Sequence, residues 1–238
     1  MFQDLIKKGI QKIYSKIDIS DEYIEWLCFA NAGMLNRGNL YCFNYAIEHL
    51  PSNNPIVEIG SFCGLSTNII NYYLSKNNKK NSLFTSDKWM FEGAEKQEEF
   101  LHVGAPCTHK EYRQFVKDSF KRNVSFFSKN NLPHTVEVFS DEFFEMWNEK
   151  RVVNDVFDRE VELGGPVSFC FIDGNHTYDF AKRDFENTDK YLEKGGFVLF
   201  DDSSDRQSLG CSRLMKEIMQ NDAYELVIKN PNYLFQKK

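Results

Sequence analysis

The sequence predicts an α/β fold in which a mostly parallel sheet lies between helices. A short apolar run, Ile56–Ile59, ends at Gly60 and is followed from Leu65 by apolar residues at helical spacing. Two later apolar runs, Phe169–Ile172 and Phe197–Phe200, show no alternation of polar and apolar residues. Such runs are typical of parallel strands that helices bury on both faces. Sheets of this kind bind nucleotide-like ligands beyond the carboxyl ends of their strands, so we expect the functional site there.

Charge, length and cysteine pattern exclude several classes of function. A chain of 238 residues with 42% hydrophobic residues can bury a sizeable core. Its formal net charge of −6 argues against a nucleic-acid or membrane-surface partner and favours a small-molecule acceptor. No signal peptide, membrane-length apolar run or Cys-x-x-Cys pair is found. We therefore expect a soluble, cytoplasmic protein with reduced thiols, of which Cys28, Cys63 and Cys170 lie in apolar runs as core residues.

Residues 1–54 are predicted to form an N-terminal helical cap ahead of a second unit, residues 55–238. Residues 1–17 place most apolar side chains on one helical face. Such a helix can lie on a membrane, or pack against the domain or a second subunit; packing is the simpler interpretation and allows a homo-oligomer through the N-terminal helices. Ser20–Glu22 is typical of a capped helix start, and Leu40–Leu50 predicts a helix before the first strand.

The turn after the first strand has the composition of a ligand-binding turn. Gly60 and Gly64 have no Cβ, so the main chain there can come close to a ligand. The helix that follows offers unpaired N–H groups at its start, with Ser66 as a hydroxyl donor for a carboxylate. A dinucleotide fingerprint would need glycine at the position of Phe62, which weakens an NAD-binding interpretation.

A second strand, Ser82–Ser86, ends on Asp87. An acidic residue at this position, roughly twenty residues after a glycine turn, is placed to bind the hydroxyls of a ribose. Trp89, Met90 and Phe91 follow, and they either pack against an adenine ring or join the core. Residues 92–131 contain a predicted helix, Glu111–Val124, and are longer than a usual connection, which predicts a lid insertion over the acceptor pocket.

The remaining segments complete the predicted order of strands and helices. They are a strand at Thr135–Phe139, a helix at Glu142–Asn148, a charged surface connector at Lys150–Gly165, a helix at Asp179–Lys194, a helix at Cys211–Met219, and a closing hairpin of strands Tyr224–Ile228 and Tyr233–Gln236.

Carboxylates follow two of the buried strands. Asp173 comes directly after Phe169–Ile172, and Asp201 and Asp202 come directly after the strand that ends at Phe200. Because parallel strands end at one edge of a sheet, we expect these carboxylates to crowd together and to resist ionisation unless they share a cation. Mg²⁺ is the natural partner, since it prefers carboxylate oxygens and acidifies a bound hydroxyl. His176 is within reach to take a proton, or it forms a loop hydrogen bond.

Two stretches resemble class I S-adenosylmethionine-dependent methyltransferases. Residues 58–67, Glu-Ile-Gly-Ser-Phe-Cys-Gly-Leu-Ser-Thr, resemble their first motif in the form seen in the catechol O-methyltransferase-like and macrolide-sugar O-methyltransferase groups. Residues 173–178, Asp-Gly-Asn-His-Thr-Tyr, and residues 195–202, Gly-Gly-Phe-Val-Leu-Phe-Asp-Asp, resemble the metal-binding half of the same groups. The resemblance implies a Rossmann-like, seven-stranded, mostly parallel sheet with a C-terminal antiparallel hairpin.

The resemblance also implies a role for individual residues. Contacts to S-adenosylmethionine are implied for Glu58, Gly60, Ser61, Gly64, Ser66, Asp87, Ser140 and Asp173. Binding of Mg²⁺ or a similar divalent cation is implied for Asp173, Asp201 and Asp202, and catalytic roles are expected for His176 and Asp173. Met34, Asn39 and Tyr41 are weaker candidates, because the segment before the first strand covers the cofactor in these enzymes. The related sugar enzymes often have an Asp, proposed as the base, where this chain has Asn175, so either His176 takes the proton or the acceptor needs no base.

The expected function is therefore Mg²⁺-assisted O-methylation of a small hydroxylated acceptor, such as a sugar or a related metabolite. Two alternatives stay open from the sequence. One is N-methylation of a small amine, which needs less help with deprotonation and could do without a metal. The other is a nucleotide-binding or NAD-binding Rossmann protein that transfers no methyl group.

Overall fold

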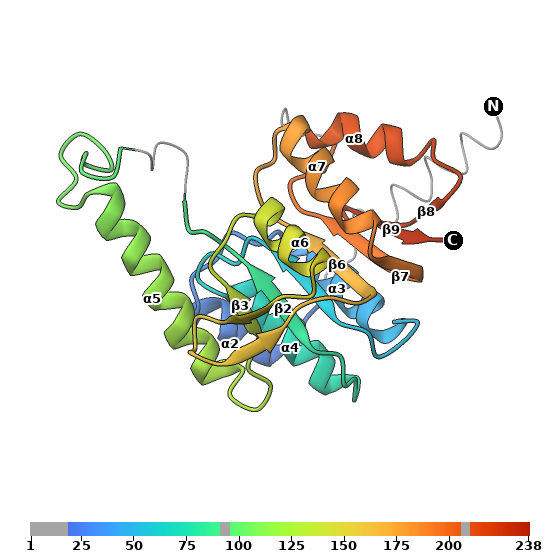
Figure 1. Cartoon of the computed structure of the whole chain (residues 1–238), viewed down its shortest axis with the longest axis horizontal. Helices are drawn as coiled ribbons and strands as arrows, with labels where there is room; N and C mark the ends of the chain where they lie inside the picture. Colours follow the sequence, from blue (N-terminus) through green and yellow to red (C-terminus); the bar gives the residue numbers. More distant parts are fainter. Residues whose placement is uncertain (1–18, 91–95, 206–209) are drawn as a thin grey trace.

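The computed structural model describes residues 19–90, 96–205 and 210–238, and its centre is a seven-stranded sheet (Figure 1). The strand order is β3-β2-β1-β6-β7-β9-β8. All neighbours from β3 to β7 are parallel, whereas β9 is antiparallel to both β7 and β8. The predicted sheet and its closing hairpin are thus confirmed. The strands are β1 (Ile56–Ile59), β2 (Leu83–Ser86), β3 (His134–Val136), β6 (Val167–Ile172), β7 (Leu192–Phe200), β8 (Tyr224–Lys229) and β9 (Tyr233–Lys237).

Helices cover both faces of the sheet, which explains the unbroken apolar runs of its central strands. Successive residues of a strand point to opposite faces. Accordingly, Val57 and Ile172 belong to one core cluster and Ile56 and Phe171 to another. The first face is covered by α6 (Ser140–Asn148), α7 (Tyr178–Asp189) and α8 (Cys211–Ile218), and the second by α2 (Glu22–Ala30), α3 (Gly38–Glu48) and α4 (Leu65–Lys76).

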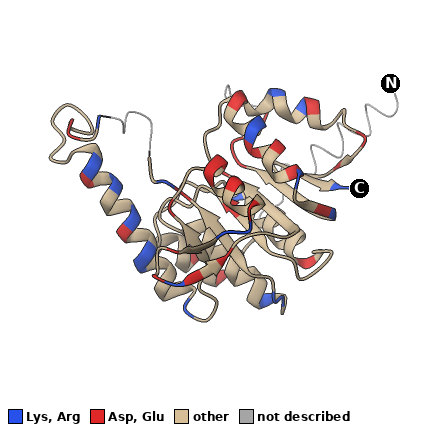
Figure 2. Ribbon diagram, in the orientation of Figure 1, with Lys and Arg blue, Asp and Glu red and all other residues tan. Residues whose placement is uncertain are grey.

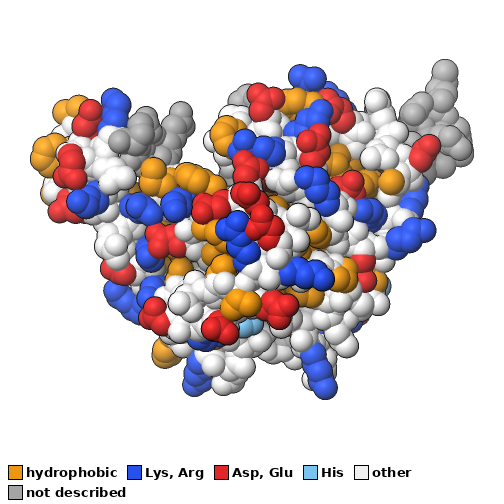
Figure 3. All heavy atoms as spheres, in the orientation of Figure 1, with side chains coloured by type: hydrophobic (Ala, Val, Ile, Leu, Met, Phe, Trp, Pro, Cys, Tyr) orange, Lys and Arg blue, Asp and Glu red, His pale blue; other side chains and the backbone are white. Residues whose placement is uncertain are grey.

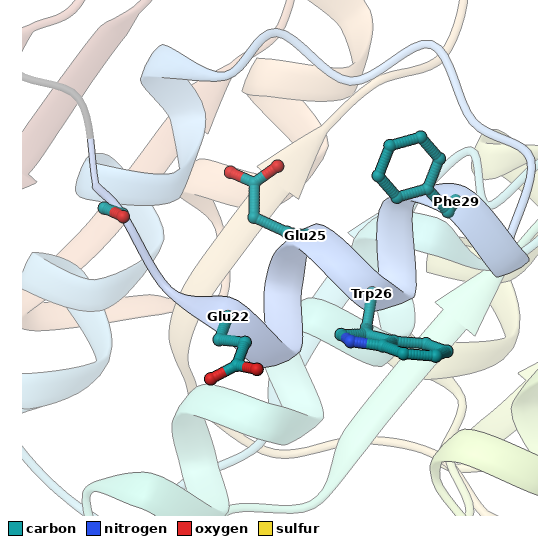
Figure 4. A pocket seen from close by; sticks show the side chains of 5 residues that line it. Glu22, Glu25, Trp26 and Phe29 are labelled. Atoms are coloured by element: carbon teal, nitrogen blue, oxygen red, sulfur yellow. The ribbon is translucent and has the colours of Figure 1, made fainter.

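The N-terminal cap packs directly on the second face. Asp21 caps α2, accepting hydrogen bonds from the main-chain N–H groups of Tyr23 and Ile24 at 3.1 and 3.3 Å. The opposite side of α2 is open: Trp26 is 71% exposed and Phe29 is 92% exposed. They line a pocket of about 640 Å³, and Figure 4 shows both side chains projecting from the helix. The helix predicted at residues 1–17 lies outside the described residues.

Helix α5 (His109–Phe127) projects from the body of the protein (Figure 1), and Figure 2 shows basic residues spaced along it. It starts with a capping box between Thr108 and Glu111 and buries only Val116, Phe120 and Val124. The described part of the predicted lid insertion therefore consists of α5, the loop at its tip and the short segment that leads to β3. No helix in the described residues, α5 included, has the length and apolar character needed to cross a bilayer.

Three predicted features are wrong in detail. Helix α7 ends at Asp189, and the residues after Tyr191 begin β7 instead of extending the helix to Lys194. The segment at 150–165 is not a plain connector, because it holds a two-stranded antiparallel sheet, β4 (Val152–Asn154) and β5 (Glu160–Glu162). Three-residue strands are too short to give a periodic signal. Cys28 is exposed, whereas Cys63 and Cys170 are buried as expected; all six cysteines are free thiols.

Candidate active site

The glycine turn between β1 and α4 is shaped by close contact with the loop after β6. Gly60 and Gly64 have φ angles of +83° and +87°, which side chains other than glycine rarely adopt. A Cβ on Gly60 would lie 2.1 Å from the carbonyl oxygen of Asp173. A Cβ on Gly64 would lie 2.8 Å from Val124 of α5. Gly60 is therefore the point at which two predicted parts of the site meet.

Glu58 is a carboxylate buried inside the protein, at the end of β1. Its side chain is fully buried, and its Oε2 accepts a hydrogen bond of 2.5 Å from the Thr67 hydroxyl. Its Oε1 has no hydrogen-bond partner in the described structure. Burial raises the pKa of Glu58 to about 7, against hydrogen bonds from Ser66, Thr67 and Ser61 that favour the charged form. Glu58 and Ser66 thus lie together under the glycine turn.

Asp87 fastens the glycine turn to β2. Its Oδ2 accepts the main-chain N–H groups of Ser61 at 2.8 Å and Phe62 at 2.9 Å, and its Oδ1 accepts that of Trp89 at 2.6 Å. Burial nevertheless raises its pKa. Asp87 therefore lies where the sequence placed it, and its expected ribose contact stays a prediction.

Of the two aromatic residues that follow Asp87, Trp89 is described and belongs to the core. The Trp89 ring is fully buried against Phe120, at 5.3 Å between ring centroids, which supports the core interpretation over an adenine contact. Phe91 lies outside the described residues. Ser140, the other predicted adenine contact, begins α6, and its hydroxyl binds the buried carboxylate of Asp184.

The three predicted carboxylates come together because β6 and β7 are adjacent and end in register, Ile172 opposite Phe200. Asp173 and Asp201 are within hydrogen-bonding contact. Burial, reinforced by the charges of neighbouring carboxylates, raises the pKa of Asp173 well above its usual range. The Nε2 atom of His176 lies 3.8 Å from Oδ1 of Asp173 and 3.6 Å from Oδ2 of Asp202.

This donor set has the chemistry of a hard-cation site. Carboxylate oxygens are the ligands that Mg²⁺ prefers, and a cation would offset the burial and the repulsion that together raise the pKa of Asp173. Within residues 19–90, 96–205 and 210–238, however, no group of three acidic, His or Cys side chains stands in a ligating arrangement. Asp201 instead directs its Oδ1 atom toward two carboxamides, those of Asn39 and Asn232.

The other residues considered in the sequence lie in the loop after β6 and in the N-terminal cap. The Asn175 side chain accepts the N–H of Thr177 at 2.9 Å, as in a turn. The Tyr178 hydroxyl lies 2.9 and 2.8 Å from the two carboxylate oxygens of Glu217, to which it donates, and so ties α7 to α8. Met34 is 82% exposed in the segment between α2 and α3, and Tyr41 packs on the core.

Asn232 is the residue that sequence reasoning missed. Its segment was interpreted only as a hairpin turn, which it is. The predicted hairpin could have revealed it. Tyr233, the first residue of β9, pairs with Phe200, the last residue of β7, so Asn232 lies next to Asp201.

A protein-family model described as a methyltransferase domain matches residues 57–203, from β1 to the loop after β7. The chain belongs to this family. The match and the fold together identify a class I S-adenosylmethionine-dependent methyltransferase, so the NAD-binding alternative is dropped. The residues present fit this cofactor: Gly60 leaves room at the turn, and Glu58 keeps a buried oxygen without a partner.

Solved structures share the fold of this methyltransferase at low sequence identity. The O-methyltransferase TomG from Streptomyces achromogenes, in complex with S-adenosylmethionine, is 12% identical, with 97% of this chain and 96% of that chain covered and a TM-score of 0.55. An O-methyltransferase from Bacillus cereus, in complex with S-adenosylhomocysteine, is 14% identical, with 97% of each chain covered and a TM-score of 0.55. CalS11, a TDP-rhamnose 3′-O-methyltransferase, is 16% identical over 97% of this chain and 92% of that chain, with a TM-score of 0.51. No curated protein matches the sequence significantly.

The contact between Gly60 and Asp173 can be tested by Gly60→Ala. We expect a loss of S-adenosylhomocysteine affinity of about 100-fold or more, since the new methyl group adds strain at a positive φ and a clash with main-chain atoms. Calorimetric titration measures the affinity. Gly104→Ala is the matched control, because Gly104 has a φ of +81° with nothing within 4 Å of the added Cβ. An equal loss in both variants would contradict the importance of the contact.

Glu58 predicts a pH dependence of stability in the cofactor-free protein. A folded pKa of about 7 against an ordinary value of 4.5 means that the folded state binds the proton more tightly than the unfolded chain. Stability from this group is present below pH 4.5 and is lost as the pH rises to about 7, by on the order of 3 kcal/mol. Glu58→Gln should remove this decline, as measured by urea unfolding at several pH values. Identical pH profiles for the variant and the wild type would refute the assignment.

Proposed function

We propose that the methyltransferase moves the methyl group of S-adenosylmethionine to a hydroxyl oxygen of a small acceptor, and that Asp173, Asp201 and Asp202 hold Mg²⁺ or a similar divalent cation. The observation that carries the proposal is the grouping of these carboxylates with His176 beside the glycine turn. One main-chain contact, between Gly60 and Asp173, joins the cofactor turn to this cluster. The acceptor oxygen and the methyl donor can therefore meet at one sheet edge.

A sugar or a related metabolite is our proposed acceptor. TomG and the Bacillus cereus protein are named O-methyltransferases, and CalS11 is named for a sugar nucleotide. Figure 3 shows a hollow in the surface between the projecting tip of α5 and the side that carries α7 and α8. A large nucleic-acid partner fits poorly with a net charge of −6.

Each residue then has a chemical role. The bound cofactor supplies an electrophilic methyl group on a sulfonium. A divalent cation, when bound, would orient the acceptor hydroxyl and lower its pKa. His176 accepts the proton that the acceptor hydroxyl loses as its oxygen forms the bond to the methyl carbon. Asp173 and Asp202 flank the imidazole at 3.8 and 3.6 Å from Nε2, which places His176 beside the proposed cation site.

N-methylation of a small amine remains the alternative, and Asn175 favours it. A carboxamide held in a turn cannot serve as a base. A neutral amine attacks without prior loss of a proton, so such a reaction would need neither His176 nor a cation.

The test is formation of S-adenosylhomocysteine with matched panels of hydroxyl and amine acceptors. We expect turnover of a hydroxyl acceptor, its loss after removal of divalent cations with a chelator, and its return with Mg²⁺. His176→Gln should lower kcat about 100-fold or more, because general base catalysis contributes at least this much. His49→Gln, an exposed residue at the end of α3, is the control. Turnover of amines alone, unaffected by the chelator, would overturn the proposal.

We also propose that the N-terminal cap associates with a second copy of the chain. The exposed large hydrophobic side chains on and after α2 form the docking surface: Tyr23, Trp26, Phe29 and Met34. Exposed apolar groups of this size on one short segment are typical of interaction sites. We take the occupant to be a second copy because the surface and the pocket lined by Trp26 and Phe29 belong to the N-terminal cap, and a symmetric dimer would place the same apolar surface of each copy against the other.

Trp26 reports on this association. Trp89 and Trp147 are buried, so a change of tryptophan emission with protein concentration would arise from Trp26. We expect a dimer by sedimentation and a red shift of emission on dilution. Trp26→Glu should give a monomer, whereas Phe126→Glu, at a 70% exposed position of α5, should not. A wild-type protein that sediments as a monomer at every concentration would refute the interface.

A further inference from the structure

Two buried carboxamides donate hydrogen bonds to one oxygen of Asp201. The Nδ2 atoms of Asn39 and Asn232 lie 2.6 and 2.5 Å from Oδ1 of Asp201, and Asn232 also donates to Oδ1 of Asn39 at 2.9 Å. All three side chains are almost completely buried, with exposed fractions of 0%, 1% and 4% for Asn39, Asn232 and Asp201. We call this set the amide clamp.

The clamp is assembled from opposite ends of the chain. Asn39 lies in the first turn of α3, within the N-terminal cap. Asn232 precedes β9, whose first residue, Tyr233, pairs with Phe200 at the end of β7. The main-chain N–H of Ser203 donates to Oδ1 of Asn232 at 3.1 Å, which fixes the orientation of that carboxamide so that its amino group faces Asp201.

Both N–H donors of the clamp bind the same oxygen of Asp201, Oδ1. Oδ1 receives two N–H donors, which occupy its lone pairs in the plane of the carboxylate. Oδ2 takes no part in the clamp, and Asp201 keeps two further contacts at the proposed cation site, with the main-chain N–H of Asp202 and with the Asp173 carboxyl. We propose that Asn39 and Asn232 are positioning residues for the divalent cation, holding Asp201 so that it binds the ion through Oδ2 alone. The inference rests on the proposed function, because it concerns the cation assigned there.

The cap has a second contact with the site that explains why Asn39 comes from this part of the chain. Asn31, at the end of α2, donates to the carbonyl oxygen of Cys63 in the glycine turn at 2.9 Å. The short segment from Asn31 to Asn39 therefore touches the cofactor turn at one end and Asp201 at the other. Partners that orient a metal ligand typically change metal affinity about 10- to 100-fold when removed.

The experiment measures cation binding directly, without an acceptor and without turnover. The full chain is titrated with Mn²⁺, and free Mn²⁺ is followed by electron paramagnetic resonance; Mg²⁺ is titrated by calorimetry. We expect Asn39→Ala and Asn232→Ala each to weaken Mn²⁺ binding about 10-fold or more. The affinity of Asn232→Ala for S-adenosylhomocysteine without metal should stay within about twofold of wild type, since the hydrogen bonds of Asn232 go to Ser203, Asn39 and Asp201.

Asn81→Ala is the matched control for loss of a buried amide. Asn81 is 1% exposed and donates to the carbonyl oxygens of Ser52 and Asn54, ahead of β2 and at the opposite end of the strands. It should leave Mn²⁺ affinity unchanged. If an alanine variant fails to fold, by circular dichroism, the leucine variant at the same position fills the volume without the amide and takes its place.

The outcomes separate the two proposals. A wild-type protein that binds neither Mn²⁺ nor Mg²⁺ removes the cation from the proposed function and the inference with it. Wild-type binding that both clamp variants retain overturns the inference alone and leaves the cation site standing. An equal loss in Asn81→Ala would also overturn it, because the effect would then follow from general loosening of the core.

Discussion

The burial of negative charge at one edge of the sheet is the constraint on which the site depends. The carboxylates there differ in the hydrogen-bond donors that they receive. Asp87 receives three main-chain N–H groups, Asp201 receives two carboxamides, and Glu58 receives side-chain hydroxyls. Asp173 has carboxylates as neighbours and a His176 ring at 3.8 Å. Because its charge is the least compensated by hydrogen-bond donors, Asp173 is where a cation would gain most.

The sheet topology makes this concentration of charge unavoidable. β1 lies between β2 and β6, and β6 lies between β1 and β7, so the residues after four parallel strands share one edge. The antiparallel β9 then returns to the same edge and brings Asn232 with it. Helices on both faces exclude water from the strands, which is why the residues just beyond the strand ends are desolvated as well. Fold and site chemistry thus follow from a single arrangement.

The sequence predicted the parts of the site that sit on strand ends, and it missed those that depend on contacts between distant segments. Gly60, Asp87, Asp173 and Asp201 follow short apolar runs that have few other interpretations, so their placement was correct. Asn39 could only be a weak candidate, because its partner lies 162 residues away in the chain. The small sheet of β4 and β5 and the early start of β7 were missed, since tertiary packing, which no local pattern records, sets them.

The N-terminal cap is part of the catalytic unit in physical terms. Ile24 and Phe43 of the cap share a core cluster with Phe169 and Leu199 of the central strands, so without the cap α4 alone among these helices would cover the second face of the sheet. Two side-chain amides of the cap reach the site, one at the cofactor turn and Asn39 at Asp201. A cap that both covers the core and holds the acidic edge couples folding of the N-terminal region to the geometry of the site. The inward amides and apolar residues of the cap are therefore constrained by the sheet and its acidic edge, whereas the exposed side of α2 is constrained only by the proposed association with a second copy.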